Sequence, residues 1–259
     1  MESVNEKLTK MNDAAQVVLN ENETLFDEET ITTLKDAISA AQKAKVEIPD
    51  KMQVFEKLSL DETAKSKELK SLKEKAETDL ETMKGIEVSE VPEVPDYTDI
   101  IKMVSDALAV YEDSVQSLKQ ITAPTDNFVM ERLQRVDTIT AMAAVTEDHD
   151  PNGQLGKQGG YIGCIYWSDS QIDSSKTYNY SGDVIEVGTV GGGAIEIYNT
   201  ENEAKKRNEY LSSFDGTGVA SGSHYVYGTI VIRTSDYLSG EKQQGLNQKV
   251  LEVLTTIDR

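Results

Sequence analysis

The densest cluster of side-chain oxygens in the sequence is Asp148-His149-Asp150-Pro151-Asn152-Gly153-Gln154-Leu155. It matches the opening of an EF-hand-type calcium loop, which has oxygen ligands at positions 1, 3 and 5, glycine at 6 and an aliphatic residue at 8. The match ends at position 12, where Gly159 replaces a bidentate glutamate. We therefore predict at most a weak calcium site, with Asp148, Asp150, Asn152 and Gln154 as ligands. The alternative is a solvated Asx-turn, in which these side chains bond their own backbone.

Acid–base chemistry has one set of candidate groups. Glu186 and Glu196 flank a glycine-rich segment, and His224 begins a strong strand signal. A carboxylate pair can act as general acid and base, which keeps a cell-envelope hydrolase as an alternative. Acids on strand faces mostly confer solubility in a protein with a net charge of −20. We therefore predict no catalytic residues, unless these three groups meet in one pocket.

Two further patterns favour structural roles over chemical ones. Cys164 is the only cysteine and lies in an apolar run, Tyr161–Trp167, where a buried thiol is more usual than an activated thiolate. Alternation puts Cys164 and Tyr166 on one face and Tyr161, Ile165 and Trp167 on the other, so this strand should lie inside a sheet. The run Gly188–Gly193 lacks the Lys-Ser/Thr of a phosphate-binding loop and leads into a strand, which predicts a hairpin turn.

The first 120 residues carry the pattern of amphipathic helices. Apolar residues recur at helical spacing in four runs, beginning at Val4, Ile31, Leu69 and Ile101. The third run continues through Leu72, Ala76, Leu80 and Met83, with Asp61 as a candidate cap and Gly85 as a stop. Four such segments joined by short breaks predict an antiparallel helical bundle over residues 1–120.

Residues 121–259 alternate helix and strand signals. Thr125 opens a short helix, strands are predicted at 139–145, 161–167, 193–198 and 224–233, and an amphipathic helix ends the chain. Thr200 and Glu203 have the spacing of a capping box that starts another helix. Within it, Lys205-Lys206-Arg207 is interpreted as a solvated helical face. The order predicts an α+β sandwich, an antiparallel sheet with helices on one face.

Composition separates these two domains and excludes several function classes. Glycine, arginine and most tyrosines are concentrated after residue 120. The chain has 259 residues with 26 Lys+Arg against 46 Asp+Glu, and this acid excess argues against nucleic acid as a partner. No run of apolar residues is long enough to predict a transmembrane segment.

The second domain resembles an uncharacterised domain of predicted surface lipoproteins and other exported proteins of Gram-positive bacteria. The resemblance rests on four ordered segments, ITAPTDNFVMERLQRV, AVTEDHDPNGQLGKQGGY, GGGAIEIYNTENEAKKRNEYLSSFDGT and SGSHYVYGTIVIRTSDYLSGEKQQ. In that family a signal peptide and a lipid-attachment cysteine usually precede a variable helical region. The resemblance implies location and architecture but no activity. The chain departs from it at Met1-Glu2-Ser3, which is neither a signal peptide nor a lipidation site.

The sequence thus predicts a two-domain exported protein, a helical bundle at 1–120 followed by an α+β domain at 121–259. The expected function is a non-catalytic binding or interaction module on a Gram-positive cell surface. Its partner would be another protein or a cell-envelope ligand, and membrane attachment would come only through a lipid anchor upstream of Met1. A cytosolic adaptor is the remaining alternative.

Overall fold

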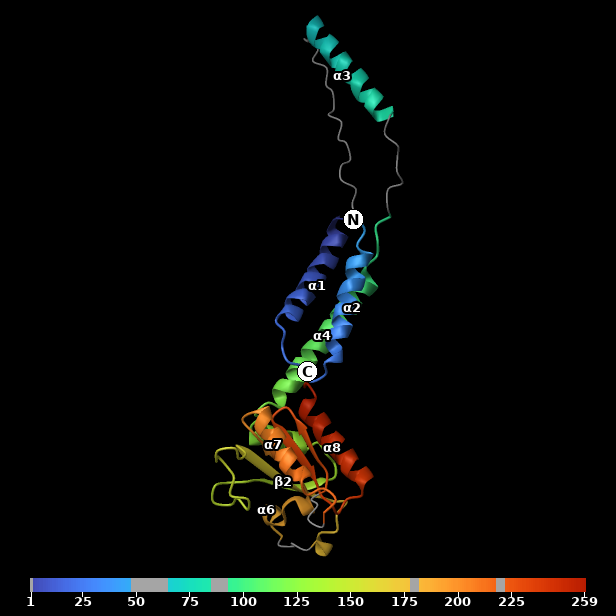
Figure 1. Cartoon of the computed structure of the whole chain (residues 1–259). Helices are drawn as coiled ribbons and strands as arrows, with labels where there is room; N and C mark the ends of the chain where they lie inside the picture. The colour runs from blue at the N-terminus through green and yellow to red at the C-terminus, as the bar shows by residue number, and fades with distance from the viewer. Residues whose placement is uncertain (1, 48–64, 85–92, 178–181, 218–221) are drawn as a thin grey trace. The chain divides into compact units, whose positions relative to one another are not determined.

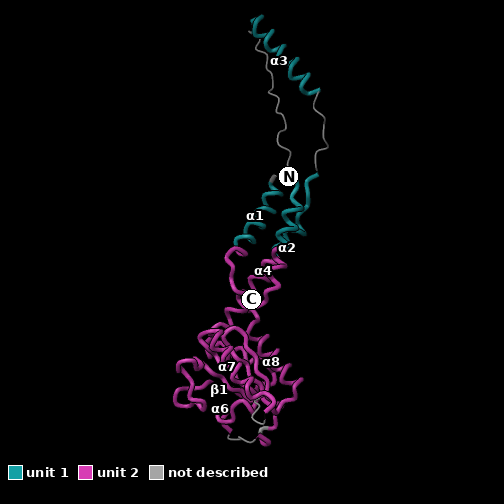
Figure 2. The backbone as a smooth tube through the Cα atoms, in the orientation of Figure 1, with its two compact units in different colours: residues 1–17, 36–105 teal, residues 18–35, 106–259 magenta. Residues whose placement is uncertain are grey.

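The protein is represented by a computed structural model that describes residues 2–47, 65–84, 93–177, 182–217 and 222–259. Contacts divide the chain into two units (Figure 2). One comprises residues 1–17 and 36–105, and the other comprises 18–35 and 106–259. This division cuts through helices, whereas the predicted boundary at residue 120 keeps each helix whole. The boundary at 120 therefore stays a prediction.

The N-terminal part of the chain is helical, as predicted (Figure 1). Its helices are α1 (Glu2–Asn20), α2 (Glu29–Ala44), α3 (Ser66–Lys84) and α4 (Thr98–Gln120). The buried residues of α1, α2 and α4 include Leu8, Ala15, Leu34, Ile38, Ala41, Val104, Tyr111 and Val115. The helical spacing therefore identified the core positions of these three helices.

A hydrogen-bonded cluster links three parts of the first unit. The Tyr97 hydroxyl donates to Asn5 Oδ1 at 2.9 Å and accepts from the Val46 backbone N–H at 2.8 Å. Asn5 Nδ2 in turn donates to the Val46 carbonyl at 2.8 Å. These bonds join α1 to the segments that follow α2 and precede α4, with all three polar side-chain atoms satisfied.

Helix α3 departs from the predicted bundle. It forms over the expected residues, but none of them is buried, and the predicted core residues Leu69, Leu80 and Met83 are 42%, 51% and 52% exposed. The helix is rich in Lys and Glu, which pair at (i, i+3) and (i, i+4) spacing, as in Lys84–Glu81 and Lys73–Glu77. Such pairs stabilise a helix by themselves, so α3 does not require a buried face to form. The assignment of this stripe to a core is therefore wrong. The expected cap and stop at Asp61 and Gly85 lie outside the described residues.

The C-terminal part contains a five-stranded antiparallel sheet in the order β1-β2-β3-β5-β4. Its strands are β1 (Ile139–Ala144), β2 (Gly163–Asp169), β3 (Gly192–Ile197), β4 (His224–Tyr227) and β5 (Ile230–Thr234). The single strand predicted at 224–233 is instead a hairpin, β4–β5. Tyr227 pairs with Ile230, so two residues make the turn, and Gly228 has a φ of +53°, which a two-residue hairpin turn requires.

Helices cover both faces of this sheet, so the prediction of helices on one face is wrong. Helices α5 (Asp126–Leu133) and α8 (Gly240–Thr255) pack on the face that carries Ile165, Trp167 and Ile195. Helix α7 (Glu201–Ser212) and the short α6 (Val184–Val187) pack on the opposite face, over Cys164, Tyr166 and Ala194. The physical reason is visible in the strands, which are apolar on both sides and must bury both.

The glycine-rich segment is not the predicted hairpin turn. Asp183 accepts hydrogen bonds from the backbone N–H groups of Ile185 and Glu186 and so begins α6. Gly188, with a φ of +67°, ends that helix, and a 3-10 turn (Gly188–Gly191) leads directly into β3. A single helical turn is too short to give a periodic signal in the sequence.

No helix among the described residues is long and apolar enough to cross a bilayer.

Cys164 is placed as predicted, inside the sheet. It is fully buried on β2, which lies between β1 and β3. Tyr161 packs on the same side as Cys164 instead of the opposite one, because the strand begins only at Gly163 and the alternation does not extend back to it. Burial raises the pKa of the thiol well above its usual value, and the nearby Glu196 carboxylate raises it further.

We expect Cys164 to react slowly with a thiol reagent in the native protein. The solvent-excluded thiol remains protonated near neutral pH, and the thiolate is the reactive form. Absorbance-monitored labelling with an aromatic disulfide should accelerate by orders of magnitude in denaturant. Equally fast labelling in the folded protein would contradict the structural assignment of this residue.

Candidate functional site

A pocket of about 620 Å³ opens over the sheet face covered by α7. One wall comes from the loop before β2, with Asn152, Gln154, Gln158, Gly159, Gly160 and Tyr161. The other wall comes from the end of β3 and from α7, with Tyr198, Glu203, Lys206, Arg207 and Tyr210. The volume is within the range of small-ligand sites, and the lining mixes aromatic rings with hydrogen-bonding groups.

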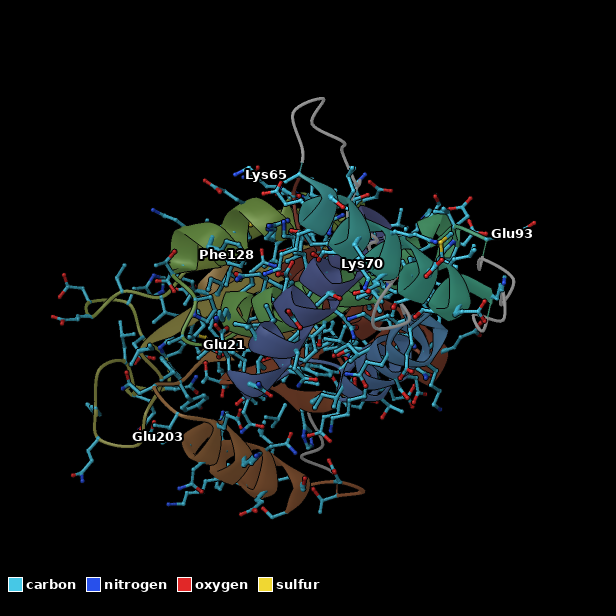
Figure 3. All side chains as sticks on the ribbon, turned by 90° about the horizontal axis from the view of Figure 1, so that it is seen from above. Glu21, Lys65, Lys70, Glu93, Phe128 and Glu203 are labelled. Carbon is cyan, nitrogen blue, oxygen red and sulfur yellow. The ribbon has the colours of Figure 1, made fainter. Side chains whose placement is uncertain are left out.

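The capping box fixes where α7 begins and therefore which of its residues reach the pocket. Thr200 Oγ1 accepts from the Glu203 N–H at 3.3 Å, and Glu203 Oε2 accepts from the Thr200 N–H at 3.1 Å. This confirms the capping box predicted from the sequence. From Glu203, labelled in Figure 3 near the start of the helix, spacings of three, four and seven residues bring Lys206, Arg207 and Tyr210 to the same face.

The loop wall is organised around Asp150. Its Oδ1 accepts from the Asn152 N–H at 3.0 Å and from the Tyr161 hydroxyl. Its Oδ2 accepts from the N–H groups of Gln154 and Leu155 at 2.6 and 2.8 Å. Burial raises the pKa of Asp150, but the hydrogen bonds from Tyr161 and these backbone groups outweigh it and lower the pKa below its usual value. The carboxylate thus holds the loop as a side-chain-capped turn, which is the alternative that the sequence left open.

The four predicted calcium ligands have different surroundings in the structure. Asp148 is exposed, and Asn152 Nδ2 donates to the Tyr166 hydroxyl at 2.9 Å. The Gln154 carbonyl accepts from the Lys157 N–H at 3.2 Å. In the part of the chain that the structure describes, no three His, Cys, Asp or Glu side chains converge on one point. Calcium binding stays a prediction, and the geometry itself accounts for Asp150 and Asn152 as turn residues.

We expect Asp150→Ala to destabilise the protein by about 2 kcal/mol, because it removes a charged acceptor shared by four donors. Asp148→Ala, at an exposed position in the same loop, should change the free energy of unfolding by less than about 0.5 kcal/mol. Thermal melts with and without millimolar calcium measure both. Under the turn interpretation the ion leaves every midpoint unchanged. A calcium-dependent rise in the parent that both substitutions abolish would establish the metal site instead.

Behind the pocket lies a buried ionic cluster centred on Glu196 of β3, a residue with no exposed surface. Arg207 binds it through Nε and Nη2, at 2.7 Å to Oε2 and 2.9 Å to Oε1. Arg233 Nη1 donates to Oε1 at 3.0 Å, and the Tyr198 hydroxyl donates to Oε2 at 2.9 Å. Burial alone would raise the pKa of Glu196, but the two guanidinium groups and the Tyr198 hydroxyl lower it below its usual value. The carboxylate is therefore ionised, and each of its oxygens accepts two hydrogen bonds from these partners.

The three groups of the hydrolase alternative do not share the pocket. Glu186 is exposed on α6, and Glu196 is covered by its ion pairs. His224 Nδ1 is 2.7 Å from Asn208 Oδ1, and its Nε2 is 3.2 Å from Asp215 Oδ1. None of the three is among the described residues that line the pocket.

Sequence reasoning named two residues of the pocket lining, Asn152 and Gln154, but as calcium ligands, and it missed the side chains that α7 contributes. Lys205-Lys206-Arg207 was expected to be a solvated face, and Lys205 fits because it pairs with Glu201 at 3.0 Å. Arg207 does not fit, since it turns inward to the buried Glu196. One signal was available in the sequence. Glu196 shares its strand face with Ala194 and Tyr198, and an ionised carboxylate on an apolar inward face requires a cationic partner.

Comparisons of the chain with protein-family models, with curated proteins and with solved structures found no match. The pocket and the ionic cluster behind it are therefore the observations from which a function can be proposed.

Proposed function

We propose that the chain is a non-catalytic binding module, and that residues 121–259 hold a small ligand or the end of a polymer in the pocket beside α7. The observation that carries this proposal is the composition of the lining. Tyrosine rings, amides and charged groups converge from two separate segments on a cavity of about 620 Å³. Such a mixture of aromatic surface and convergent polar groups is typical of ligand-binding sites.

The state of the nearest buried carboxylate also supports binding over hydrolysis. A general acid must be able to hold a proton near the working pH, and a general base must have a lone pair free for substrate. Both Glu196 oxygens accept hydrogen bonds from guanidinium groups, and its pKa is lowered. Glu196 therefore holds the Arg207 side chain in place, and Arg207 forms part of the pocket wall.

We further propose that the module acts on the surface of a Gram-positive bacterium as part of a lipoprotein-like protein. The support is the resemblance of its four ordered segments to exported proteins. The net charge of −20 disfavours nucleic acid as the alternative partner. Protease treatment of intact source cells, followed by immunoblotting, tests the location. Protection of the protein in intact cells, with digestion only after lysis, would favour the cytosolic adaptor.

The binding function is tested by screening a fragment library against the ¹⁵N-labelled full chain. We expect hits to shift the amide resonances of the loop 152–161 and of the residues 198–210, since these segments form the pocket. Tyr210→Ala should weaken the hits. Tyr225→Ala is the matched control, because Tyr225 is a similarly exposed tyrosine on β4 outside the pocket lining. A library without hits, or hits that map elsewhere, would overturn the proposal.

A further inference from the structure

We infer that the ligand of this pocket is a neutral oligosaccharide. The inference deepens the proposed function and rests on it. It follows from three properties of the lining: an exposed aromatic ring held in place, groups that both donate and accept hydrogen bonds, and charges that cancel.

Tyr210 supplies the aromatic surface. Its side chain is 55% exposed, although it lies on the pocket wall. The ring of Phe214 contacts it edge-on, with centroids 5.1 Å apart, and the Arg207 guanidinium carbon lies 5.3 Å from its centroid. Both neighbours restrict the ring. Arg207 lies over one face, so a ligand stacks on the part of the ring that remains exposed. The negative face of such a ring attracts the weakly positive C–H groups of a pyranose, and the apolar contact adds to this attraction.

The remaining lining offers hydrogen bonds of both directions. Side-chain amides come from Asn152, Gln154 and Gln158. Asn152 Nδ2 already donates to the Tyr161 and Tyr166 hydroxyls and Gln154 Nε2 to the Asn152 carbonyl, so Asn152 offers its acceptor oxygen and Gln154 an acceptor oxygen and its second N–H. The hydroxyls of Tyr161 and Tyr198 donate to Asp150 and Glu196, so their oxygens can act as acceptors. The Tyr161 oxygen already accepts one bond, from Asn152 Nδ2 at 3.5 Å. Sugar hydroxyls also donate and accept, so this set matches them better than it matches a purely anionic or purely cationic group.

The charges at the pocket balance. Arg207 and Arg233 share the single negative charge of Glu196. The Asp150 carboxylate in the loop wall supplies a second negative charge. Glu203 and Lys206 contribute one charge of each sign. The rest of the protein adds a strongly negative field, at −20 for the whole chain, which disfavours anions. A neutral, hydroxyl-rich ligand is therefore favoured over a phosphate or a carboxylate.

The experiment is binding of the full chain to an array of immobilised neutral and acidic oligosaccharides, followed by calorimetric titration with the strongest neutral binder in solution. We expect neutral oligosaccharides to bind. Tyr210→Ala should weaken the affinity about tenfold through loss of the stacking surface, while Tyr225→Ala leaves it unchanged. Lys206→Ala should weaken neutral binding less than Tyr210→Ala does, because Lys206 can donate to a sugar hydroxyl but finds no opposite charge to pair with.

Each other outcome has a definite meaning. Binding confined to acidic oligosaccharides, with a large loss in Lys206→Ala, would overturn the neutral class. An array without any binding, while fragments still shift the resonances of residues 152–161 and 198–210, would overturn the saccharide inference and leave the binding function intact. If neither fragments nor oligosaccharides bind at this pocket, the saccharide inference and the binding function are both overturned. Equal loss in Tyr210→Ala and Tyr225→Ala would place binding outside the pocket.

Discussion

Glu196→Gln should lower the free energy of unfolding by about 3–5 kcal/mol, the cost of removing one partner from a buried ion pair. Glutamine has nearly the same size as glutamate, so no cavity explains the loss. Arg233 and Arg207 would be left without a counter-charge, with only 10% and 23% of their side-chain surfaces exposed. Since a whole domain is stable by only about 5–15 kcal/mol, chemical denaturation detects this change easily.

Glu209→Gln is the matched control for this substitution. Glu209 is an exposed glutamate on α7, two residues from Arg207, so the same chemical change should cost less than about 0.5 kcal/mol there. If both variants lost similar stability, net charge would be the cause and the ionic cluster would not be. The double substitution of Glu196 and Arg233 by apolar residues gives a second readout, because removing both partners should recover part of the loss.

The difference in unfolding free energy between the parent protein and Glu196→Gln should depend on pH, and the direction of the change can be derived. The pKa of Glu196 is lower in the folded protein than its ordinary value of 4.5. A lowered folded pKa contributes stability that is present above the unfolded pKa and is lost as pH falls through the folded pKa. The difference in unfolding free energy should therefore have its largest value at pH 7 and should decrease as the pH falls below about 4.5. A difference that stays constant from pH 7 to pH 3 would show that the charge of Glu196 is not the source.

Periodicity predicted the elements well where they are long and one-sided. Helices α1, α2 and α4 bury the apolar residues that recur at helical spacing, and Thr200 with Glu203 identified the start of α7. The same pattern failed at α3, because spacing tells which residues share a face but not whether another surface covers it. The turn at Gly228 was missed because a strand signal of ten residues conceals a two-residue reversal.

The candidate site was less predictable because it depends on contacts between distant residues. The sequence left Asp150 as a calcium ligand or a turn-forming carboxylate, and only the structure shows the turn, with Tyr161 and three backbone N–H groups donating to it. Arg207 and Glu196 are eleven residues apart and on different elements, so no local spacing pairs them. The second pair meets because the sheet is covered on both faces, so that α7 brings Arg207 over β3.

Gly193→Ala should be destabilising by about 3 kcal/mol or more, although it adds a single methyl group. A Cβ at this position of β3 would lie 2.2 Å from Trp167 Cζ2 and 2.4 Å from the Arg233 carbonyl oxygen. Neither neighbour can retreat easily, since Trp167 is fully buried and the carbonyl belongs to the adjacent strand β5. Glycine in a strand marks such a close approach, and overpacking of this kind forces the backbone or the indole out of place.

Gly245→Ala is the matched control, with the same chemical change in an opposite environment. Gly245 lies inside helix α8, where an added Cβ meets nothing within 4 Å. Alanine should stabilise that helix by about 0.5–1 kcal/mol, because glycine loses more backbone entropy on folding. Trp167 is the only tryptophan, so its fluorescence separates the two effects. In Gly193→Ala the native emission should shift as the indole is displaced, and in Gly245→Ala only the unfolding midpoint should move. An unchanged native spectrum with unchanged stability in Gly193→Ala would contradict the packing of Trp167 across β3.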